Sequence, residues 1–274
     1  MPPERKLRPD VCDYEGSNYR TEFWENQGRE YEDRAERIAL RRLLPRDGGK
    51  RLLEVGAGFG RLTEEYKRYE QVVLLDYSFS QLQYARERYG DGGGRYVYVA
   101  ADAYALPFRA GVFDGASMIR TIHHMSHVDT VLSQVHRVLA PGGVFILEHA
   151  NKQNMKAVLR YRLKKQTWNP HDLEPVEFVE LNYDFHPEYI KRALMNTGFE
   201  IRKRVPVSFF RVGALKKAVP VGMLASLDGL LQMSGMLYAP SVFVKSIAKG
   251  ESADRTLNAD ILSLLACPET GESL

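Results

Sequence analysis

Apolar runs alternate with amphipathic stretches through the middle of the chain. The apolar runs predict strands over residues 51–55, 71–77, 95–102, 112–119 and 143–150. The stretches between them predict helices over 61–69, 80–89 and 127–139, and Ser78 can cap the second of these helices. Strands that alternate with helices are typical of a parallel sheet covered by helices on both faces. The pattern therefore predicts one α/β unit from about residue 40 to 150.

Composition narrows the class of protein. The chain has 274 residues and is 44% hydrophobic, which suffices for one large core. Its net charge of +3 is the balance of 38 basic and 35 acidic side chains, so no nucleic-acid partner is expected. Two cysteines, Cys12 and Cys267, and a charged, proline-rich start without signal-peptide character predict a cytoplasmic protein. No apolar span of about 18 residues predicts a transmembrane helix.

A glycine-rich turn follows the first predicted strand, in "LLEVGAGFGRL" (52–62). Glycines allow the main chain to approach a ligand closely, and free amides at the start of a helix can donate hydrogen bonds to it. The spacing Gly-x-Gly-x-Gly differs from the dinucleotide pattern Gly-x-Gly-x-x-Gly. Glu54 precedes the glycines, and its carboxylate would repel a diphosphate but attract an amino group or a sulfonium. The turn therefore favours a cationic nucleoside ligand, with an ordinary tight turn as the alternative.

Two further acids end the next two predicted strands. Asp76 lies twenty residues after Gly56, the separation at which an acid can accept hydrogen bonds from both ribose hydroxyls. Asp102 ends the third strand, where a carboxylate can accept a hydrogen bond from the exocyclic amine of a purine. Capping of a helix is the alternative for Asp76. Acids at three successive strand ends together predict a nucleoside site along one edge of the sheet.

Four segments carry a resemblance to a known family: "LLEVGAGFGRL", "VVLLDYSFSQLQYAR", "VAADAYALPFRAGVFDGASMIRTIHHM" and "VHRVLAPGGVFILEH". In this order they resemble the motifs of class I S-adenosylmethionine-dependent methyltransferases, in particular the small-molecule branch that includes the ubiquinone/menaquinone methyltransferases. The resemblance covers about residues 48 to 150 and continues more weakly to about residue 248. It implies a Rossmann-like α/β fold with a seven-stranded, mostly parallel sheet. Strand six would fall in 198–211 and an antiparallel strand seven in 239–249, between strands five and six.

The resemblance also implies a cofactor and its site. S-adenosylmethionine would bind and leave as S-adenosylhomocysteine, after an in-line displacement in which an O, N or C nucleophile of a small-molecule acceptor attacks the methyl group. Glu54, Gly56 and Gly58 would flank the methionine part of the cofactor and Asp76 its ribose, while Asp102 and the backbone of Ala103 would read the adenine. Ala57, Tyr77 and Arg120 complete the predicted cofactor-binding set.

Segments outside these motifs would determine the acceptor. Residues 1–45 are predicted to form a helical lid over the methyltransferase domain, 46–250, with Tyr14, Tyr19, Trp24 and Tyr31 lining the substrate pocket; packing of an N-terminal helix is the alternative. Insertions are predicted at about 151–186 and 212–238. The first carries Lys156, Arg160, Arg162, Lys164 and Lys165, which could grip an anionic acceptor or a membrane surface, or form a solvated helix face.

The second insertion and the tail carry further signals. Residues 212–238 are apolar with three methionines, and could form an acceptor wall, an oligomer contact or core. The tail, 251–274, resembles the opening of small zinc-ribbon modules. Because it holds Cys267 without a second cysteine, we expect no zinc. The acceptor's identity and the oligomeric state do not follow from the sequence.

Two adjacent histidines, His123 and His124, follow the fourth strand near where the methyl group should point. An imidazole titrates near neutral pH, so either is a candidate general base, with His124 preferred and packing at a helix start as the alternative. His127 extends the cluster, but because the sequence offers no convincing acidic partner for these histidines, we expect no metal site. Two other functions compete with methyl transfer: a nicotinamide-dependent oxidoreductase, and a non-catalytic cofactor-binding protein with a methyltransferase-like fold.

Overall fold

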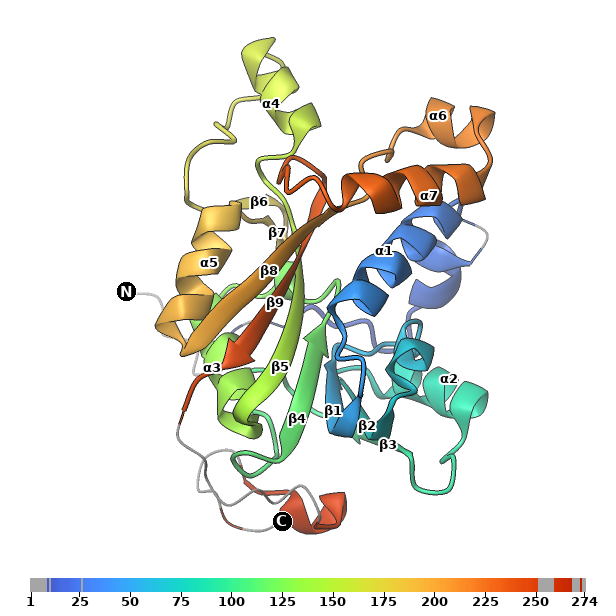
Figure 1. Cartoon of the computed structure of the whole chain (residues 1–274), viewed down its shortest axis with the longest axis vertical. Helices are drawn as coiled ribbons and strands as arrows, with labels where there is room; N and C mark the ends of the chain where they lie inside the picture. The colour runs from blue at the N-terminus through green and yellow to red at the C-terminus, as the bar shows by residue number, and fades with distance from the viewer. Residues whose placement is uncertain (1–8, 10, 26, 251–258, 268–271, 273–274) are drawn as a thin grey trace.

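The computed structural model describes residues 9, 11–25, 27–250, 259–267 and 272. At its centre lies a seven-stranded sheet in the order β3-β2-β1-β4-β5-β9-β8 (Figure 1). Strands β1 to β5 pair in parallel, and β9 runs antiparallel to both of its neighbours. The predicted fold class is therefore confirmed, including the antiparallel strand between the fifth and sixth. The strands are β1 (Gly49–Val55), β2 (Tyr69–Asp76), β3 (Tyr96–Ala100), β4 (Phe113–Met118), β5 (Leu139–Ala150), β8 (Phe199–Val207) and β9 (Ser241–Ala248).

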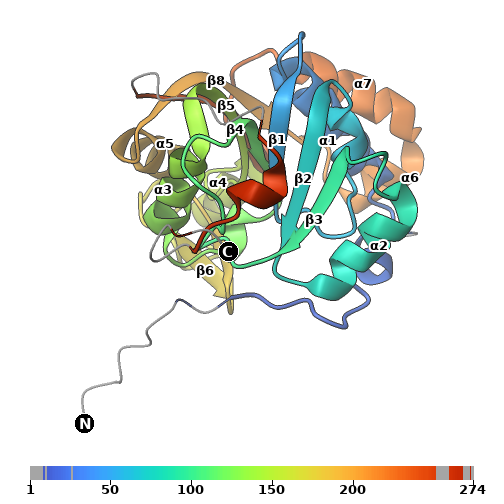
Figure 2. The same ribbon diagram turned by 90° about the horizontal axis from the view of Figure 1, so that it is seen from below.

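Helices cover both faces of this sheet (Figures 1 and 2). Successive side chains of a strand point to opposite faces, so Leu52 and Leu53 enter different cores. The Leu52 core packs against α1 (Glu30–Leu43), α2 (Phe79–Tyr89) and α7 (Val221–Leu231). The Leu53 core packs against α3 (Val128–Val138) and α5 (Pro187–Asn196).

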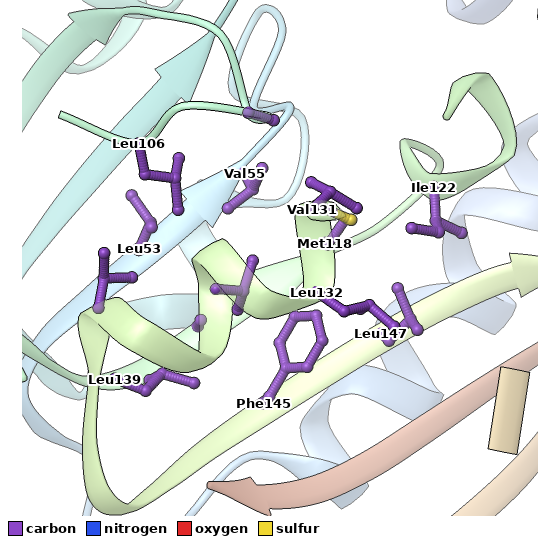
Figure 3. Packing of buried hydrophobic residues seen from close by; sticks show 14 of the residues in the cluster. Leu53, Val55, Leu106, Met118, Ile122, Val131, Leu132, Leu139, Phe145 and Leu147 are labelled. Atoms are coloured by element: carbon purple, nitrogen blue, oxygen red, sulfur yellow. The ribbon is translucent and has the colours of Figure 1, made fainter. Parts of the chain in front are cut away.

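The Leu53 core is built around the apolar face of α3. Figure 3 shows Val131 and Leu132 of this helix facing Leu53 of β1 and Phe145 of β5. These four side chains are fully buried. Replacing such a leucine by alanine typically costs about 2–5 kcal/mol, so this layer contributes substantially to the stability of the sheet.

The remaining elements lie at the two ends of the sheet. Beyond the carboxyl ends of the parallel strands lie α4 (Met155–Arg162), the hairpin β6–β7 (Val176–Val179 and Asn182–Asp184), α6 (Gly213–Ala218) and two short helices, η1 (Arg20–Trp24) and η3 (Ile122–His124). A third short helix, η2 (Thr63–Tyr66), lies in the crossover from β1 to β2 and contacts β2 and α1. At the opposite end, near the amino ends of the parallel strands, lies η5 (Ile261–Leu264), which stands in front of the sheet in Figure 2. Ile261 and Leu264 are buried there, and Arg51 Nη2 donates to the carbonyl of Ala259 at 2.7 Å.

One predicted helix is wrong. The stretch 61–69 holds only the four-residue 3-10 helix η2, because Tyr69 already begins β2 and both Tyr66 and Tyr69 are buried. The other two predicted helices are confirmed as α2 and α3, and Ser78 Oγ caps α2 by accepting from Gln81 N at 3.3 Å. The division into lid, methyltransferase domain, insertions and tail stays a prediction.

Candidate functional site

The glycine turn after β1 has the backbone conformation that only glycine adopts readily. Gly56, Gly58 and Gly60 have φ values of +69°, +52° and +73°. A Cβ atom on Gly56 would lie 2.1 Å from Thr121 Oγ1, so a side chain is excluded there by packing. A Cβ on Gly58 would meet no heavy atom within 4 Å. Gly58 therefore leaves room for something other than protein.

Two adjoining cavities lie along this turn at the carboxyl ends of β1, β2 and β4. We call the first the Asp76 cavity; Asp76, Tyr77, Ala103, Tyr14 and His124 line it. We call the second the Glu54 cavity; Glu54, Ala57, Arg61, Trp24 and Ile119 line it. Gly56, Gly58, Tyr19 and Arg120 line both. The two cavities thus follow one continuous stretch of backbone, as a long ligand would.

Asp76 is held in place by the turn it faces. Its Oδ2 accepts from Gly58 N at 2.7 Å and its Oδ1 from Ser78 N at 2.9 Å. Burial raises the pKa of this carboxyl, while the two backbone donors oppose the rise. Each carboxylate oxygen has a second lone-pair direction. The group is therefore oriented by the protein and retains acceptor capacity toward the cavity.

Asp102 does not repeat this arrangement. Its Oδ1 accepts from Tyr104 N at 2.8 Å, which closes a turn after β3. Among the described residues that line the Asp76 cavity, Ala101 and Ala103 represent this turn and Asp102 does not. A purine ring bound in the cavity would therefore contact the backbone of this turn before it reached the Asp102 carboxylate.

Glu54 is a buried carboxyl at the wall of the second cavity. Its Oε2 accepts from Thr63 Oγ1 at 2.6 Å. Burial raises its pKa to about 7, against the opposing effects of Thr63 and Arg61. The main cost of ionising Glu54 is that the buried carboxylate loses its solvation. A cation that enters this cavity would offset this cost by electrostatic attraction and so favour the ionised form.

A buried ion-pair cluster closes the far wall of the Glu54 cavity. Glu36 accepts from Arg120 Nε at 2.8 Å and from Arg61 Nη2 at 2.6 Å. Burial alone would raise the pKa of Glu36, but the two guanidinium groups outweigh it and hold the pKa at about 2. The guanidinium carbon of Arg61 lies 3.7 Å from the Trp24 ring centroid, and that of Arg120 lies 5.5 Å from it. The cluster thus fixes Trp24 and leaves both arginines on the cavity wall.

Arg120 has an unusual backbone for this role. Its φ of +60° is rare for a residue with a side chain. The strain is held by two contacts, the ion pair with Glu36 and a hydrogen bond from Arg120 N to Glu148 Oε2 at 2.9 Å. Strained backbone conformations that several contacts hold in place occur mainly at functional sites. There they direct a side chain to a position that a regular backbone would not give it.

His124 has one ring nitrogen tied to the backbone and one facing the cavity side. The Nδ1 atom lies 2.9 Å from the carbonyl oxygen of Leu181, an obligate acceptor, so Nδ1 carries the proton. The Nε2 atom is then an acceptor and lies 3.4 Å from Tyr14 Oη. Burial lowers the pKa of His124, which keeps the ring neutral near pH 7. The geometry presents Nε2 as a base.

His123 is less well placed. Its ring centroid lies 4.0 Å from that of His124, and burial lowers its pKa well below the ordinary value. Among the described residues, the lining of the Asp76 cavity includes His124 and leaves His123 out. Of the two candidates, the structure therefore favours His124.

Three of the four predicted lid aromatics reach the cavities. Tyr14 and Tyr19 line the first, and Tyr19 and Trp24 line the second. Tyr31 does not: it is 1% exposed, and its hydroxyl donates to Asp228 Oδ2 at 2.5 Å and accepts from Phe210 N at 2.9 Å. We correct that assignment, because Tyr31 joins α1 to α7 rather than contacting a substrate.

Several contributors to the site were not predicted from the sequence. Cys12, Gln81, Thr121 and Met125 also line the Asp76 cavity. Thr121 could have been found, since it directly follows Arg120 in the segment just after β4. The Leu181 carbonyl that orients His124 comes from the turn of the β6–β7 hairpin, and no side-chain pattern encodes such a contact.

The comparisons with known proteins agree with this geometry. A family model described as a methyltransferase domain matches residues 53–147. A Pseudomonas putida protein named ubiquinone/menaquinone biosynthesis C-methyltransferase UbiE is 30% identical over 168 residues, which cover 56% of this chain and 66% of that protein. The protein of the same name from Teredinibacter turnerae is 30% identical over 167 residues, covering 55% and 67%. The alignments thus span about two thirds of the length of these relatives.

Solved structures show the same fold at lower identity. An S-adenosylmethionine-dependent methyltransferase from Mesorhizobium loti has a TM-score of 0.54 and 22% identity, covering 78% of this chain and 97% of its own. The [4+2]-cyclase SpnF has a TM-score of 0.57 and 21% identity, covering 83% and 87%. These likenesses concern the fold alone.

A seven-stranded sheet with this strand order and a glycine turn facing an acid on the next strand defines the Rossmann-like methyltransferase class. Together with the family model and the relatives, it shows that the chain belongs to the class I S-adenosylmethionine-dependent methyltransferases. The predicted family and its cofactor, S-adenosylmethionine, are confirmed, and the nicotinamide alternative is not favoured.

The described residues lack two features, a membrane-spanning helix and a cluster of metal ligands. Within that part of the chain, no helix combines the length and the apolar character that crossing a bilayer requires. In the same residues, no three side chains of the types His, Cys, Asp and Glu gather as metal ligands. Most of the tail around Cys267 lies outside the described residues, so the expected absence of zinc stays a prediction.

Proposed function

We propose that this protein transfers a methyl group from S-adenosylmethionine to a small-molecule nucleophile bound beside His124. The observation that carries the proposal is the continuity of the two cavities. Asp76 and Glu54 each stand in one of them, and both cavities share the same glycine turn. His124 lines the Asp76 cavity, and its unprotonated Nε2 lies 3.4 Å from Tyr14 Oη, a hydroxyl that an acceptor molecule would replace.

The residues present fit the cofactor. Asp76 would accept hydrogen bonds from the two ribose hydroxyls, and the open space at Gly58 would admit the ribose and the adjoining chain. Tyr77 and the backbone at Ala103 would hold the adenine. Glu54, Ala57 and Arg120 would surround the methionine end, where Glu54 faces its cationic amino group and the arginines its carboxylate.

The chemistry then needs positioning and one proton acceptor. When bound, S-adenosylmethionine supplies an electrophilic methyl group on a sulfonium. The acceptor's nucleophile would form a bond to that methyl carbon, and the electron pair of the broken carbon–sulfur bond would stay on sulfur as a neutral thioether. His124 Nε2 would take the proton that the acceptor loses, and the Leu181 carbonyl would hold the resulting imidazolium in place. Tyr14 and Tyr19 would contact the acceptor and exclude water.

The acceptor class follows less closely from the site. The relatives' names describe C-methyltransferases, which favours a carbon nucleophile among the O, N and C alternatives. Such an acceptor loses a proton from carbon, so a base in the pocket suits it. The expected cytoplasmic location remains part of this proposal.

Thermal-shift measurements with S-adenosylmethionine, S-adenosylhomocysteine and NAD test the cofactor assignment. We expect stabilisation by the first two ligands only, and loss of this stabilisation in Asp76→Ala. Transfer of labelled methyl from S-adenosylmethionine to a panel of phenol, quinol and amine acceptors then tests turnover. Stabilisation by NAD alone would overturn the proposal, whereas cofactor binding without turnover of any acceptor would leave the non-catalytic alternative as the better account.

A further inference from the structure

We propose that the end of the molecule formed by α4 and α7 docks on an anionic membrane surface. The docking surface consists of two parts: α4 with the residues that follow it (155–165), and α7 with the loop that leads to β9 (221–238). Both parts project beyond the carboxyl ends of the parallel strands, at the top of Figure 1. The two parts adjoin, because Met155 N donates to the carbonyl of Tyr238 at 2.8 Å.

The first part stands away from the core. Within α4 only Ala157 is buried, while Met155 is 64% exposed and Leu159 is 55% exposed. Tyr161 and Leu163 are exposed as well. Exposed large apolar side chains on a projecting helix are costly in water unless a partner covers them.

The second part adds an apolar ridge beside the first. Leu230 is 61% exposed, Met233 67% and Met236 49%. The one acid in this segment, Asp228, is buried and accepts from Tyr31. The ridge therefore presents apolar side chains with no exposed carboxylate among its residues.

Charge identifies the partner. Residues 155–165, "MKAVLRYRLKK", hold five basic side chains and no acidic one. Apolar side chains surrounded by Lys and Arg are the pattern of segments that lie in the headgroup region of anionic bilayers, where the long basic chains reach the phosphates. A symmetric dimer through this surface would place the same cations opposite each other, which argues against a second copy of the chain.

Docking in this orientation would serve the site. The cavities lie at the same end of the sheet as the docking surface, and the Leu181 turn that holds His124 belongs to the same insertion as α4. An acceptor dissolved in the bilayer could then reach His124 without crossing water. This consequence rests on the proposed function, but membrane docking itself does not.

Vesicle co-sedimentation of the full chain tests the proposal. We expect binding to an equal mixture of phosphatidylcholine and phosphatidylglycerol, weak binding to phosphatidylcholine alone, and release by added salt. The variant Lys156→Gln/Arg162→Gln/Lys165→Gln should bind the mixed vesicles roughly tenfold or more weakly. A matched control, Arg46→Gln/Lys50→Gln/Lys67→Gln, removes the same charge at the opposite end of the sheet and should bind like the parent.

A second pair of variants tests the apolar contribution. Met155→Ser/Met233→Ser should weaken binding, whereas Met195→Ser/Leu262→Ser, which changes equally exposed side chains elsewhere, should not. S-adenosylhomocysteine affinity by calorimetry should be unchanged in all four variants, which shows that they fold and separates this proposal from the proposed function. No binding to the mixed vesicles, equal losses in test and control variants, or a dimer that the methionine variant dissociates would overturn the proposal.

Discussion

The buried carboxyl of Glu54 should make cofactor binding depend on pH. Burial holds its pKa at about 7 in the empty protein, well above the ordinary value of about 4.3. The amino group and sulfonium of the cofactor would stabilise the ionised form and return the pKa toward the ordinary value. Binding near neutral pH should therefore release a proton, and affinity should rise with pH.

The size of the effect follows from the two pKa values. If the pKa falls from about 7 to about 4.3 on binding, linkage predicts an affinity increase of about tenfold between pH 6 and pH 8. At pH 7 about half a proton should be released per cofactor bound. In the unfolded chain Glu54 ionises with the ordinary pKa of about 4.3, whereas in the folded empty protein its pKa is about 7. The folded state therefore holds this proton more tightly, so the stability of the empty protein should fall as pH rises from about 4.3 to about 7.

Calorimetry in buffers of different ionisation enthalpy measures both quantities. Glu54→Gln keeps the shape of the side chain and removes its titration, so the difference between the parent and this variant cancels the cofactor's own titration. We expect the variant to bind more weakly at pH 8 and to lose its share of the proton release. Equal pH dependence in parent and variant would refute the placement of the cationic end beside Glu54.

Three further variants test the rest of the site. Gly58→Val should nearly abolish S-adenosylhomocysteine binding in calorimetry while the protein remains folded, because the side chain would fill open cavity space and strain a positive φ; unchanged binding would contradict the assigned role of the turn. Asp76→Ala should weaken binding tenfold or more, since hydrogen bonds to charged groups contribute about 1.5–3 kcal/mol each, and Asp102→Ala should cost less; an Asp76→Ala variant that binds like the parent would reduce this acid to a cap. His124→Ala should lower kcat by about 10² to 10⁴, leave cofactor binding nearly unchanged and remove the acidic limb of the pH profile, which the lowered pKa places below the ordinary 6.5. Near-parental turnover in both His124→Ala and His123→Ala would mean that the enzyme works by proximity alone.

The centre of the sheet was predictable from the sequence because β1, β2 and β4 are mainly buried on both faces. A continuous apolar run such as "VVLLD" has few other stable environments in a chain of this size. The glycine turn was equally clear, since its backbone conformation excludes other residues. The short segment after the turn was not, because "TEEYKR" has helical character but only eight residues separate Gly60 from the start of β2.

Contacts between distant segments account for the remaining errors and omissions. Tyr31 looks like its pocket-lining neighbours in the sequence, yet its hydroxyl meets Asp228, 197 residues away. The Leu181 carbonyl contacts His124 across 57 residues of sequence, and Glu36 contacts Arg120 across 84. Nothing local distinguishes such partners, because the tertiary fold decides which polar groups become buried together.

The central claim is that one extended cavity along the glycine turn holds S-adenosylmethionine with its ribose on Asp76. A crystal structure with S-adenosylhomocysteine tests it most directly. We expect both ribose hydroxyls within hydrogen-bond distance of the Asp76 carboxylate, the homocysteine end beside Glu54 and the sulfur directed toward the His124 side. A ligand bound elsewhere, or one whose ribose does not contact Asp76, would contradict the claim.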